Sequence, residues 1–216
     1  MSTPKVLLTV PCTGSLRKEL AAAIMCMTRD PRCSVDVRFQ SERPYEHSLN
    51  LLARQAADGE YDFWLTFDDD QCPITNPLDL VELNLDVVSC PAPIWMPDKS
   101  PHYPVVWNAF DDLGGENYRA HQPMSGLQEV GIVGSGALLI TRRVFESLER
   151  PFLIDWDAAG RKLAGPDIAF CRRAREAGFK IWCHYDYPCR HYVVTDIAEV
   201  GDWIARHFSI KQKVPI

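Results

Sequence analysis

Stretches with the apolar pattern of β-strands alternate along this chain with stretches that have the apolar pattern of helices. Apolar runs at Lys5–Val10 and Tyr61–Phe67, and an alternating stretch at Cys33–Phe39, have the length and pattern of β-strands. Between them, apolar residues spaced three or four apart predict helices from Ser15 to Thr28 and from Tyr45 to Asp58. This β-α-β-α-β order predicts a parallel, doubly wound sheet.

The second half of the chain extends the same α/β pattern after one interruption. Residues 91–128 are rich in proline and aromatic side chains, which is typical either of an ordered excursion with its own small core or of one wall of a substrate cleft. Outside that segment, we expect a short helix over Pro77–Leu83, strands over Asp86–Cys90, Gly131–Thr141 and Phe179–Cys183, and helices over Arg142–Leu148, Gly165–Ala177 and Asp196–Phe208.

The run Tyr61–Phe67 stops at three consecutive carboxylates, Asp68, Asp69 and Asp70. Like charges repel one another and cannot enter a core unpaired. In an open α/β sheet, ligands gather at the carboxyl ends of the strands, and a hard divalent cation is the simplest partner for carboxylate oxygens there. The sequence therefore predicts a metal site at this strand end. The alternative is an acidic turn that only ends the strand and caps the next helix.

Composition and charge narrow the class of protein. A length of 216 residues favours one domain with a sizeable core, and 46% hydrophobic with 24% charged residues is ordinary for a globular protein. The net charge of −6 disfavours broad electrostatic binding to nucleic acid. No apolar run approaches the length of a membrane span, and the N-terminus lacks a signal-peptide pattern, so we expect a cytoplasmic protein without a membrane span.

The 8 cysteines include no CxxC pair. Without an export signal, reduced thiols are expected rather than a disulfide framework. The cluster formed by Cys183-His184 and Cys189-Arg190-His191 could hold zinc, but its spacing matches no common zinc finger.

Four stretches, in this order and spread over most of the chain, resemble the GT-A glycosyltransferases of the family 2 type and their phage and bacterial relatives. LLTVPCTG resembles the strand and turn that cradle the nucleotide. The segment Leu49–Arg54 leads into YDFWLTFDDD as the family's Asn-bearing helix leads into its Asp-x-Asp (DxD) strand. VGIVGSGALLITRRVFESL resembles the glycine-bearing strand and the helix after it. GPDIAFCRRAREAGFKIWCHYDYPCRHY resembles the family's Glu-Asp helix, next strand and late His, with Pro166 where the family often has Glu.

The resemblance implies an α/β fold of the GT-A (Rossmann-like) nucleotide-diphospho-sugar transferase type, with a mostly parallel central sheet flanked by helices. Residues 1–216 would form one domain, with a nucleotide-binding half at 1–90 and an acceptor- and sugar-binding half at 91–216. The donor would be a nucleotide sugar, expected to be a UDP-sugar, bound with Mn²⁺ or Mg²⁺. The acceptor stays open: a glycan, a protein, a small molecule or a modified nucleic acid would each supply a hydroxyl.

The resemblance also implies a metal-ligand set. Asp70 would contact the metal, and Asp68 would contact the metal or the ribose. Asp69 would point the other way, because successive side chains alternate along an extended backbone. His191 would be a third ligand, and a neutral imidazole suits Mn²⁺ better than Mg²⁺; the alternative is a His that only caps a loop.

Donor contacts are implied in two further places. Asn50 would lie beside the base or ribose, and Arg54, on the same helical face, would pair with a phosphate or hold a surface hydrogen bond one turn away. Thr9 and Pro11 would line the base through their backbones. Gly134, Ser135 and Gly136 would let the sugar approach the backbone closely, unless these small residues serve a bulge or tight packing.

Asp167 is the predicted catalytic base of a single displacement that inverts the anomeric carbon. It stands at the first turn of a predicted helix, whose N-terminus favours the ionised carboxylate. The alternative is that Asp167 only caps this helix. Arg172, Arg173 and Arg175 of the same helix are typical of a solvated face, and they would be the first residues to test if the acceptor were DNA.

Three rival functions stay in view. A nucleotidyltransferase that makes a nucleotide sugar would have a Gly-rich, basic loop after the first strand, where this chain has only PCTGSLRK. A non-catalytic nucleotide-sugar-binding module would keep the fold without the chemistry, but the presence of Asp68, Asp70, Asp167 and His191 together argues against it. A Rossmann-like domain with an acidic turn is disfavoured because no GxGxxG follows the first strand.

Overall fold

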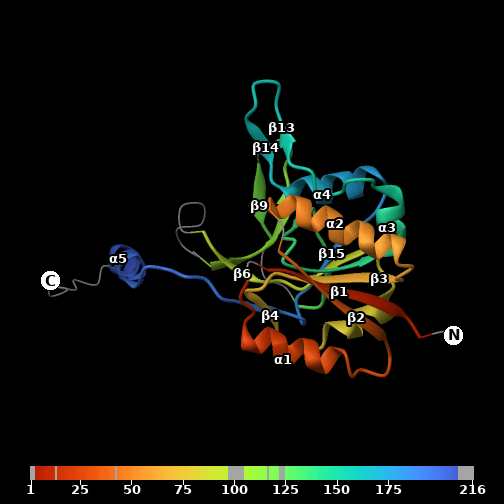
Figure 1. The fold of residues 1–216 in the computed structure, drawn as a ribbon. Helices are drawn as coiled ribbons and strands as arrows, with labels where there is room; N and C mark the ends of the chain where they lie inside the picture. Colours follow the sequence, from red (N-terminus) through yellow and green to blue (C-terminus); the bar gives the residue numbers. More distant parts are fainter. Residues whose placement is uncertain are drawn as a thin grey trace.

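The computed structural model describes residues 3–12, 14–41, 43–96, 105–115, 117–121 and 125–208. Its centre is a seven-stranded sheet with the strand order β10-β15-β5-β12-β3-β1-β2 (Figure 1). In chain order these strands are β1 (Lys5–Pro11), β2 (Ser34–Gln40), β3 (Phe63–Phe67), β5 (Val87–Ser89), β10 (Leu127–Glu129), β12 (Ala137–Thr141) and β15 (Ile181–His184).

Strand direction divides the sheet. Strand β1 runs parallel to both β2 and β3, and β5 runs parallel to β15. Strand β12 is antiparallel to both β3 and β5, and β10 is antiparallel to β15. Five of the seven strands (β2, β1, β3, β5 and β15) therefore run in the same direction, which confirms the expected mostly parallel sheet, and β12 and β10 run against them.

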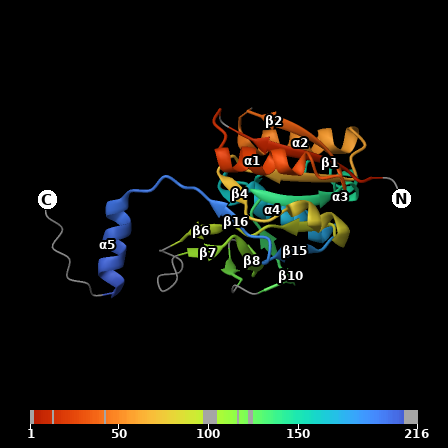
Figure 2. The same ribbon diagram turned by 90° about the horizontal axis from the view of Figure 1, so that it is seen from below.

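Helices cover both faces of the sheet and enclose two apolar cores (Figures 1 and 2). One face packs α1 (Lys18–Met27) and the 3₁₀ helix η1 (Pro77–Leu83), and the other packs α2 (Tyr45–Asp58), α3 (Arg142–Ser147) and α4 (Pro166–Glu176). Strand β3 is buried along its whole length, because its alternating side chains enter both cores. This explains why its sequence is apolar at nearly every position.

The excursion predicted after residue 90 forms small sheets beside the main one. Strands β6 (Pro93–Trp95) and β7 (Val105–Trp107) make a hairpin. Strands β8 (Ala109–Asp112), β9 (Tyr118–Ala120) and β11 (Ile132–Val133) make a three-stranded sheet, in which Phe110 and Tyr118 meet edge to face at 5.0 Å. These contacts support the ordered excursion; part of it, residues 97–104 and 122–124, lies outside the described residues.

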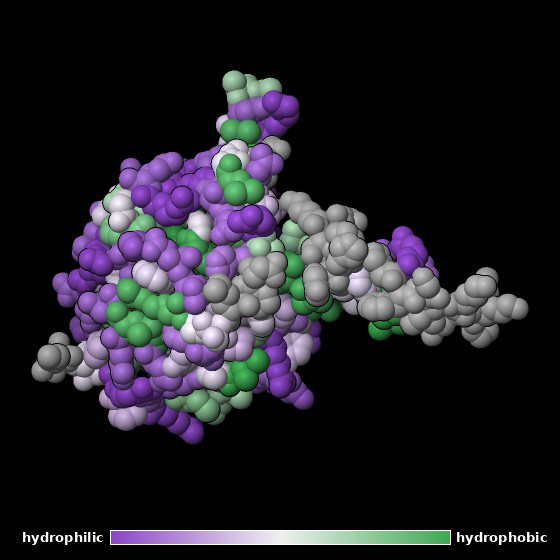
Figure 3. Space-filling view, turned by 180° about the vertical axis from the view of Figure 1, so that it is seen from behind, coloured by the Kyte–Doolittle hydropathy of each residue, from purple (hydrophilic) through white to green (hydrophobic). Residues whose placement is uncertain are grey.

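Two pairs of short strands and one helix complete the chain. Strands β4 (Gln71–Pro73) and β16 (Cys189–His191) pair antiparallel. Strands β13 (Asp155–Trp156) and β14 (Lys162–Ala164) form a hairpin that stands clear of the body next to α4 (Figures 1 and 3). Helix α5 (Ile197–Phe208) lies beyond β6 and β7 at the end of an extended segment (Figure 2). No described helix is long and apolar enough to cross a membrane.

Most of the predicted elements are confirmed, with shifted ends. Helix α1 begins at Lys18, three residues after the predicted cap Ser15, and no side chain caps it. The predicted strand Gly131–Thr141 is two strands, β11 and β12, separated by Gly134–Gly136. All 8 cysteines are unbonded, as expected for reduced thiols.

Trp64 is the central side chain of the core under α2 and α3. It is fully buried and meets Phe145 and Phe152 edge to face at 5.2 and 5.7 Å. Its indole Nε1–H donates to the hydroxyl of Thr9 at 2.7 Å, inside the core. The backbone of Thr9 pairs with both neighbouring strands, β2 and β3, and its hydroxyl is the hydrogen-bond acceptor for the indole N–H of Trp64.

We expect Thr9→Val to lower the free energy of unfolding by about 1–3 kcal/mol, because it leaves the buried indole N–H without an acceptor at nearly constant shape. Thr9→Ser keeps the hydroxyl, so its free energy of unfolding should fall clearly less. Chemical denaturation of the three proteins measures this difference. Equal stability of the Val and Ser variants would contradict the role assigned to the hydroxyl.

Candidate functional site

The three carboxylates lie in a tight turn at the carboxyl end of β3. The backbone N–H of Gln71 donates to the carbonyl of Asp68 at 3.0 Å, which closes the turn, and the N–H of Asp68 donates to the carbonyl of Gly136 at 2.8 Å. Strand β1 ends beside β3 in the same direction, whereas β12 begins there. The acidic turn therefore sits where the ends of three strands meet, as expected for a ligand site in an α/β sheet.

Two hydroxyls connect Asp68 to Asp167. Tyr45, the first residue of α2, donates its Oη–H to Asp68 Oδ1 at 2.6 Å, and its Oη also lies 3.1 Å from the Oγ of Ser135. Ser135 donates to Asp167 Oδ1 at 3.0 Å. The result is a carboxyl–hydroxyl–hydroxyl–carboxyl chain that joins the end of β3, α2, the 134–136 turn and α4.

Proton counting shows what this chain requires. Three oxygen–oxygen contacts become three hydrogen bonds only with three protons, and the two hydroxyls supply two of them. The third proton must come from one of the two carboxyls, which then donates to the hydroxyl beside it, and that hydroxyl donates onward along the chain. The pKa of Asp68 is raised to about 7: burial is the main cause, the hydrogen bond from Tyr45 opposes it, and the charges of Asp167, Asp70 and Asp69 add to the rise.

Asp167 differs from the sequence-based expectation in its ionisation. The helix terminus was expected to favour its charged form, but burial outweighs that effect and raises the pKa of Asp167; hydrogen bonds from Ser135 and from backbone N–H groups oppose the rise. The capping alternative is also not what the structure has. The N-cap of α4 is Gly165, without a side-chain cap, and the Asp167 carboxylate accepts from Ser135 instead.

Asp70 and His191 form the other half of the site. His191 Nε2 lies 3.6 Å from Asp70 Oδ2, and its Nδ1–H donates to the carbonyl of Pro93 at 2.8 Å. The hydrogen bond with Asp70 raises the pKa of His191. In metal-ligating histidines one ring N–H is likewise held by a carbonyl and the other nitrogen binds the ion; here Nε2 is that other nitrogen, and it lies beside Asp70.

The fit to a metal is therefore partial. The described residues contain no group of three or more His, Cys, Asp and Glu side chains ready to hold an ion, because Asp68 is turned to Tyr45 while Asp70 and His191 face each other. Oxygen plus imidazole donors suit Mn²⁺. Mg²⁺-type sites commonly use one or two carboxylates and take their remaining ligands from substrate phosphates and water, so Asp70 and His191 fit a cation that arrives with a phosphate ligand.

The small residues 134–136 make room for the protein's own side chains. A Cβ on Gly136 would collide with the amide of Gln71 and lie 2.6 Å from Asp68 Oδ2, and one on Gly134 would lie 2.7 Å from Asn108 Nδ2. This is the tight-packing alternative. It accounts for both glycines without a ligand, so the predicted sugar contact at them stays a prediction.

A cavity of about 260 Å³ opens next to the acidic turn, between the ends of β1 and β2 and the start of α2. Pro11 lines it, and Tyr45 is shared between this cavity and the carboxyl–hydroxyl chain; the contact of Pro11 with a base stays a prediction. The remaining lining residues are Cys12, Gln40, Ser41, Arg43, Pro44 and Ser48.

Two predicted donor contacts are occupied elsewhere. The amide of Asn50 donates to the carbonyl of Glu46 at 2.8 Å and accepts from the backbone N–H of Phe152 at 3.0 Å, so it ties α2 to the segment after α3. Arg54 lies 3.5 Å from Asp58 on the exposed side of α2, with 79% of its side chain accessible. The surface alternative is therefore the one observed for Arg54, and neither residue points to a ligand.

Three residues of the site were missed in the sequence. Tyr45 is a helix-starting tyrosine, and Gln71 follows the aspartates with a buried Oε1 that has no hydrogen-bond partner among the described residues. Arg17 places its guanidinium 5.0 Å from the ring centroid of Tyr192, whose N–H donates to the carbonyl of Asp70. Only Arg17 had a sequence signal, as part of the basic end of PCTGSLRK.

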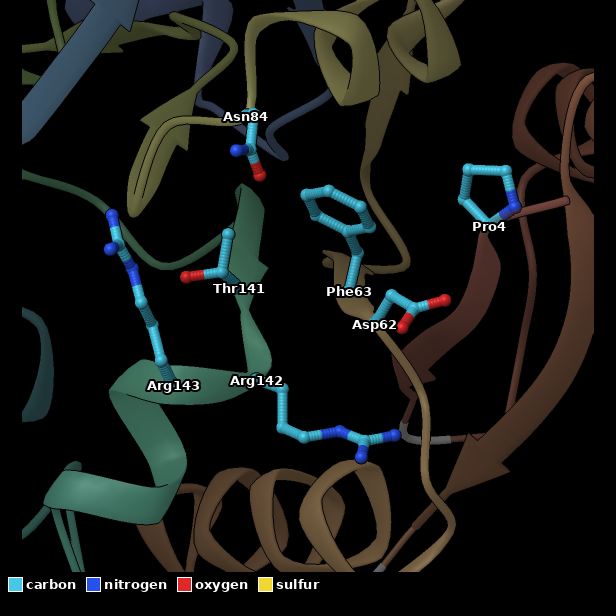
Figure 4. A pocket seen from close by; sticks show the side chains of 7 residues that line it. All are labelled: Pro4, Asp62, Phe63, Asn84, Thr141, Arg142 and Arg143. Carbon is cyan, nitrogen blue, oxygen red and sulfur yellow. The ribbon is translucent and has the colours of Figure 1, made fainter. Parts of the chain in front are cut away.

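A second cavity, of about 470 Å³, lies at the opposite end of the sheet, before the starts of β1 and β3 (Figure 4). Its two arginines are already engaged: Arg142 donates to the carbonyl of Tyr61 at 2.7 Å, and Arg143 pairs with Asp86. Figure 4 shows their side chains running in different directions. The cavity therefore offers no convergent set of polar groups, and the acidic turn is the better candidate site.

The raised pKa of Asp68 predicts an effect on stability in the absence of ligand. As pH rises from about 4 to about 7, the unfolded chain loses this proton before the folded protein does, so the contribution of Asp68 to the free energy of unfolding falls. Asp68→Asn keeps an acceptor for Tyr45 and removes the charge. At pH 8 its melting temperature should exceed that of the wild type, by about 2–4 °C for each kcal/mol by which the variant increases the free energy of unfolding. The difference should be smaller at pH 5.

Asp58→Asn is the matched control, because Asp58 is an exposed carboxylate in a surface pair. Its difference from the wild type should not grow with pH. Thermal denaturation at the two pH values measures both variants, and an Asp68→Asn variant that is less stable than the wild type at pH 8 would contradict the account.

No protein-family model and no curated protein sequence matches the chain. Solved structures do. Protein A197 from STIV superimposes with a TM-score of 0.61 at 16% identity, over 88% of this chain and 86% of its own. UDP-glucose pyrophosphorylase in complex with UDP-glucose gives a TM-score of 0.50 at 10% identity, over 96% of this chain and 99% of its own. At such identities the similarity shows the fold alone: this chain has the α/β fold of these two proteins, and the likeness does not single out the GT-A glycosyltransferases.

Proposed function

We propose that this protein is a metal-dependent glycosyltransferase that transfers a sugar from a nucleotide sugar to an acceptor hydroxyl. The observation that carries the proposal is the placement of two functional groups around one strand end. Asp70 and His191 lie on one side, suited to a cation with phosphate ligands. Asp167, a carboxylate with a raised pKa, lies on the other side beyond Tyr45 and Ser135.

The cavity beside Tyr45 has the position required of a nucleoside site. It lies at the ends of the parallel strands β1 and β2, where α/β folds bind nucleotides. Arg43 and Gln40 line it and could hold polar groups of the base or ribose. A phosphate of the same ligand would then extend toward Asp70, with Arg17 as a further cation near that side.

The chain's own residues supply the transfer step. The acceptor oxygen forms the new bond to the anomeric carbon, its proton passes to Asp167, and the bond to the nucleoside diphosphate breaks with the electron pair leaving on the phosphate. A bound cation would neutralise charge on the leaving group. Ser135 holds Asp167 in place, and Tyr45 holds Asp68.

A nucleotidyltransferase is the second candidate, because UDP-glucose pyrophosphorylase shares the fold over nearly all of this chain. The two reactions differ in their products. A glycosyltransferase without acceptor slowly hydrolyses its donor and releases a nucleoside diphosphate. A nucleotidyltransferase needs pyrophosphate and releases a nucleoside triphosphate.

One experiment separates the two candidates. UDP-, GDP- and dTDP-sugars are incubated with the protein and Mn²⁺ or Mg²⁺, with and without pyrophosphate, and the nucleotides are resolved by chromatography. We expect a nucleoside diphosphate from one donor, formed independently of pyrophosphate. A triphosphate that appears only with pyrophosphate would overturn the transferase proposal.

Asp167→Asn tests the base. The amide can still accept from Ser135, so fold and nucleotide affinity should persist, while turnover should fall about 100-fold or more, the usual scale of general-base catalysis. Calorimetry with the nucleoside diphosphate measures affinity, and Asp58→Asn serves as the control. NMR of the transfer product should show inversion; retention of the donor's anomeric configuration would rule out single displacement.

His191→Ala and Asp70→Asn test the metal ligands. Loss of a ligand should weaken Mn²⁺-dependent binding of the nucleoside diphosphate by about 10–100-fold or more. The His191 variant should also lose its preference for Mn²⁺ over Mg²⁺, since the imidazole favours Mn²⁺. Calorimetry with each metal gives both results, and an unchanged Mn²⁺-to-Mg²⁺ ratio in His191→Ala would remove His191 from the ligand set.

A further inference from the structure

The β13–β14 hairpin leads directly into the candidate base. Ala164, the last residue of β14, is followed by the N-cap Gly165 and then by Pro166 and Asp167 at the start of α4. The hairpin itself projects beyond α4 into solvent (Figures 1 and 3). Any acceptor that reaches Asp167 from this side must pass along it.

Trp156 is displayed on this hairpin. Its side chain is 59% exposed, so the indole presents a large flat apolar surface and an N–H group to solvent. Its register partner is Lys162, and the register shifts between Asp155 and Trp156, as at a β-bulge. Bulges re-aim side chains and occur often beside active sites.

Lys162 shows which way this face of the hairpin is turned. Directly paired residues of an antiparallel pair share one face, so Trp156 and Lys162 lie on the same side. The Lys162 ammonium reaches back to within 3.5 Å of where a Cβ on Gly165 would stand, and its charge acts to lower the pKa of Asp167 against the dominant effect of burial. The face that carries Trp156 is therefore the face turned to the start of α4.

Charge on the hairpin and on α4 argues against a polyanionic acceptor. Asp112 accepts from Arg172 and Arg175 at 2.8 and 2.9 Å, and Arg173 pairs with Asp155 and donates to the carbonyl of Leu153. On the hairpin, Arg161 pairs with Asp157 at 2.7 Å. These four arginines are thus paired within the protein, which leaves Lys162 as the cation beside Trp156, whereas nucleic-acid binding requires a row of unpaired cations.

We propose, building on the transferase function above, that Trp156 is the stacking platform for the acceptor and that the acceptor is a neutral glycan. A pyranose ring has an apolar face that packs on an indole, and its hydroxyls suit a single ammonium group such as that of Lys162. The ring next to the stacked one would present its hydroxyl to Asp167. Trp156 is accordingly a positioning residue for the acceptor and takes no part in donor binding.

The test uses neutral disaccharides as probes, namely cellobiose, chitobiose and maltose, with a short oligothymidylate as the rival class. Saturation-transfer NMR on the intact protein with Mn²⁺ replaced by Mg²⁺ reports binding. We expect at least one disaccharide to bind, with affinity about tenfold lower in Trp156→Ala and largely kept in Trp156→Phe. Leu163→Ala is the matched control: it is 43% exposed on the same hairpin but next to Lys162 along the strand, hence on the other face.

Each other outcome overturns the platform. These are no disaccharide binding, equal binding in Trp156→Ala and the wild type, binding of oligothymidylate that depends on Trp156, or a change of oligomeric state in Trp156→Ala, which would make the surface a contact between copies. Nucleoside diphosphate binding is measured in parallel on every variant. If a variant still binds the nucleoside diphosphate but no disaccharide, only the acceptor platform has failed. If the wild type does not bind the nucleoside diphosphate, the transferase proposal itself has failed.

Discussion

The structure depends on how three adjacent carboxylates are held at the end of a fully buried strand. Strand β3 is buried along its whole length, because β1 and β12 flank it and helices cover both faces, and Asp68 directly after it is only partly exposed. A buried carboxylate next to other carboxylates is costly unless it keeps a proton or gains donors and a counter-ion. Tyr45 supplies a donor to the carboxylate of Asp68, and the imidazole of His191 lies beside Asp70.

The need to stabilise these carboxylates brings the surrounding segments together. Asp68 draws Tyr45 from α2, Asp70 faces His191 from β16, and Ser135 links the turn before β12 to Asp167 of α4. Gly136 lacks a side chain because Asp68 and Gln71 fill the space a Cβ would need. Residues far apart in the sequence thus meet around three carboxylates that repel one another, and a divalent cation with a phosphate ligand would reduce that repulsion. A site that costs stability when empty is a common consequence of selection for function.

The sequence predicted the elements better than their directions. Apolar periodicity located β1, β2, β3 and α2 nearly to the residue, because each buries a regular set of side chains. It could not show that β12 runs antiparallel to β3, since a fully buried strand reads the same in either direction. The expected mostly parallel sheet is confirmed, but the two reversed strands within it, β12 and β10, were not expected.

The site could be predicted only where a residue type carries its own signal. The acidic turn stands out by charge, and Asp167 and His191 by their place after a glycine and after a strand. Tyr45 and Gln71 carry no such signal, because their roles come from the contacts that α2 and β4 make with the acidic turn. Asn50 and Arg54 fit a family pattern, yet their polar groups are satisfied by Phe152, Glu46 and Asp58, which no local reading of the chain would reveal.

The central claim is that the acidic end of β3 binds a divalent cation together with a nucleotide. Anomalous diffraction from crystals grown with Mn²⁺ and a nucleoside diphosphate tests it most directly, because manganese can be located without assumptions about the ligand. The account predicts one anomalous peak within bonding distance of Asp70 and His191, with the nucleoside in the cavity between Pro11 and Tyr45. Nucleotide bound elsewhere, or manganese absent from Asp70 in crystals that contain bound nucleotide, would contradict it.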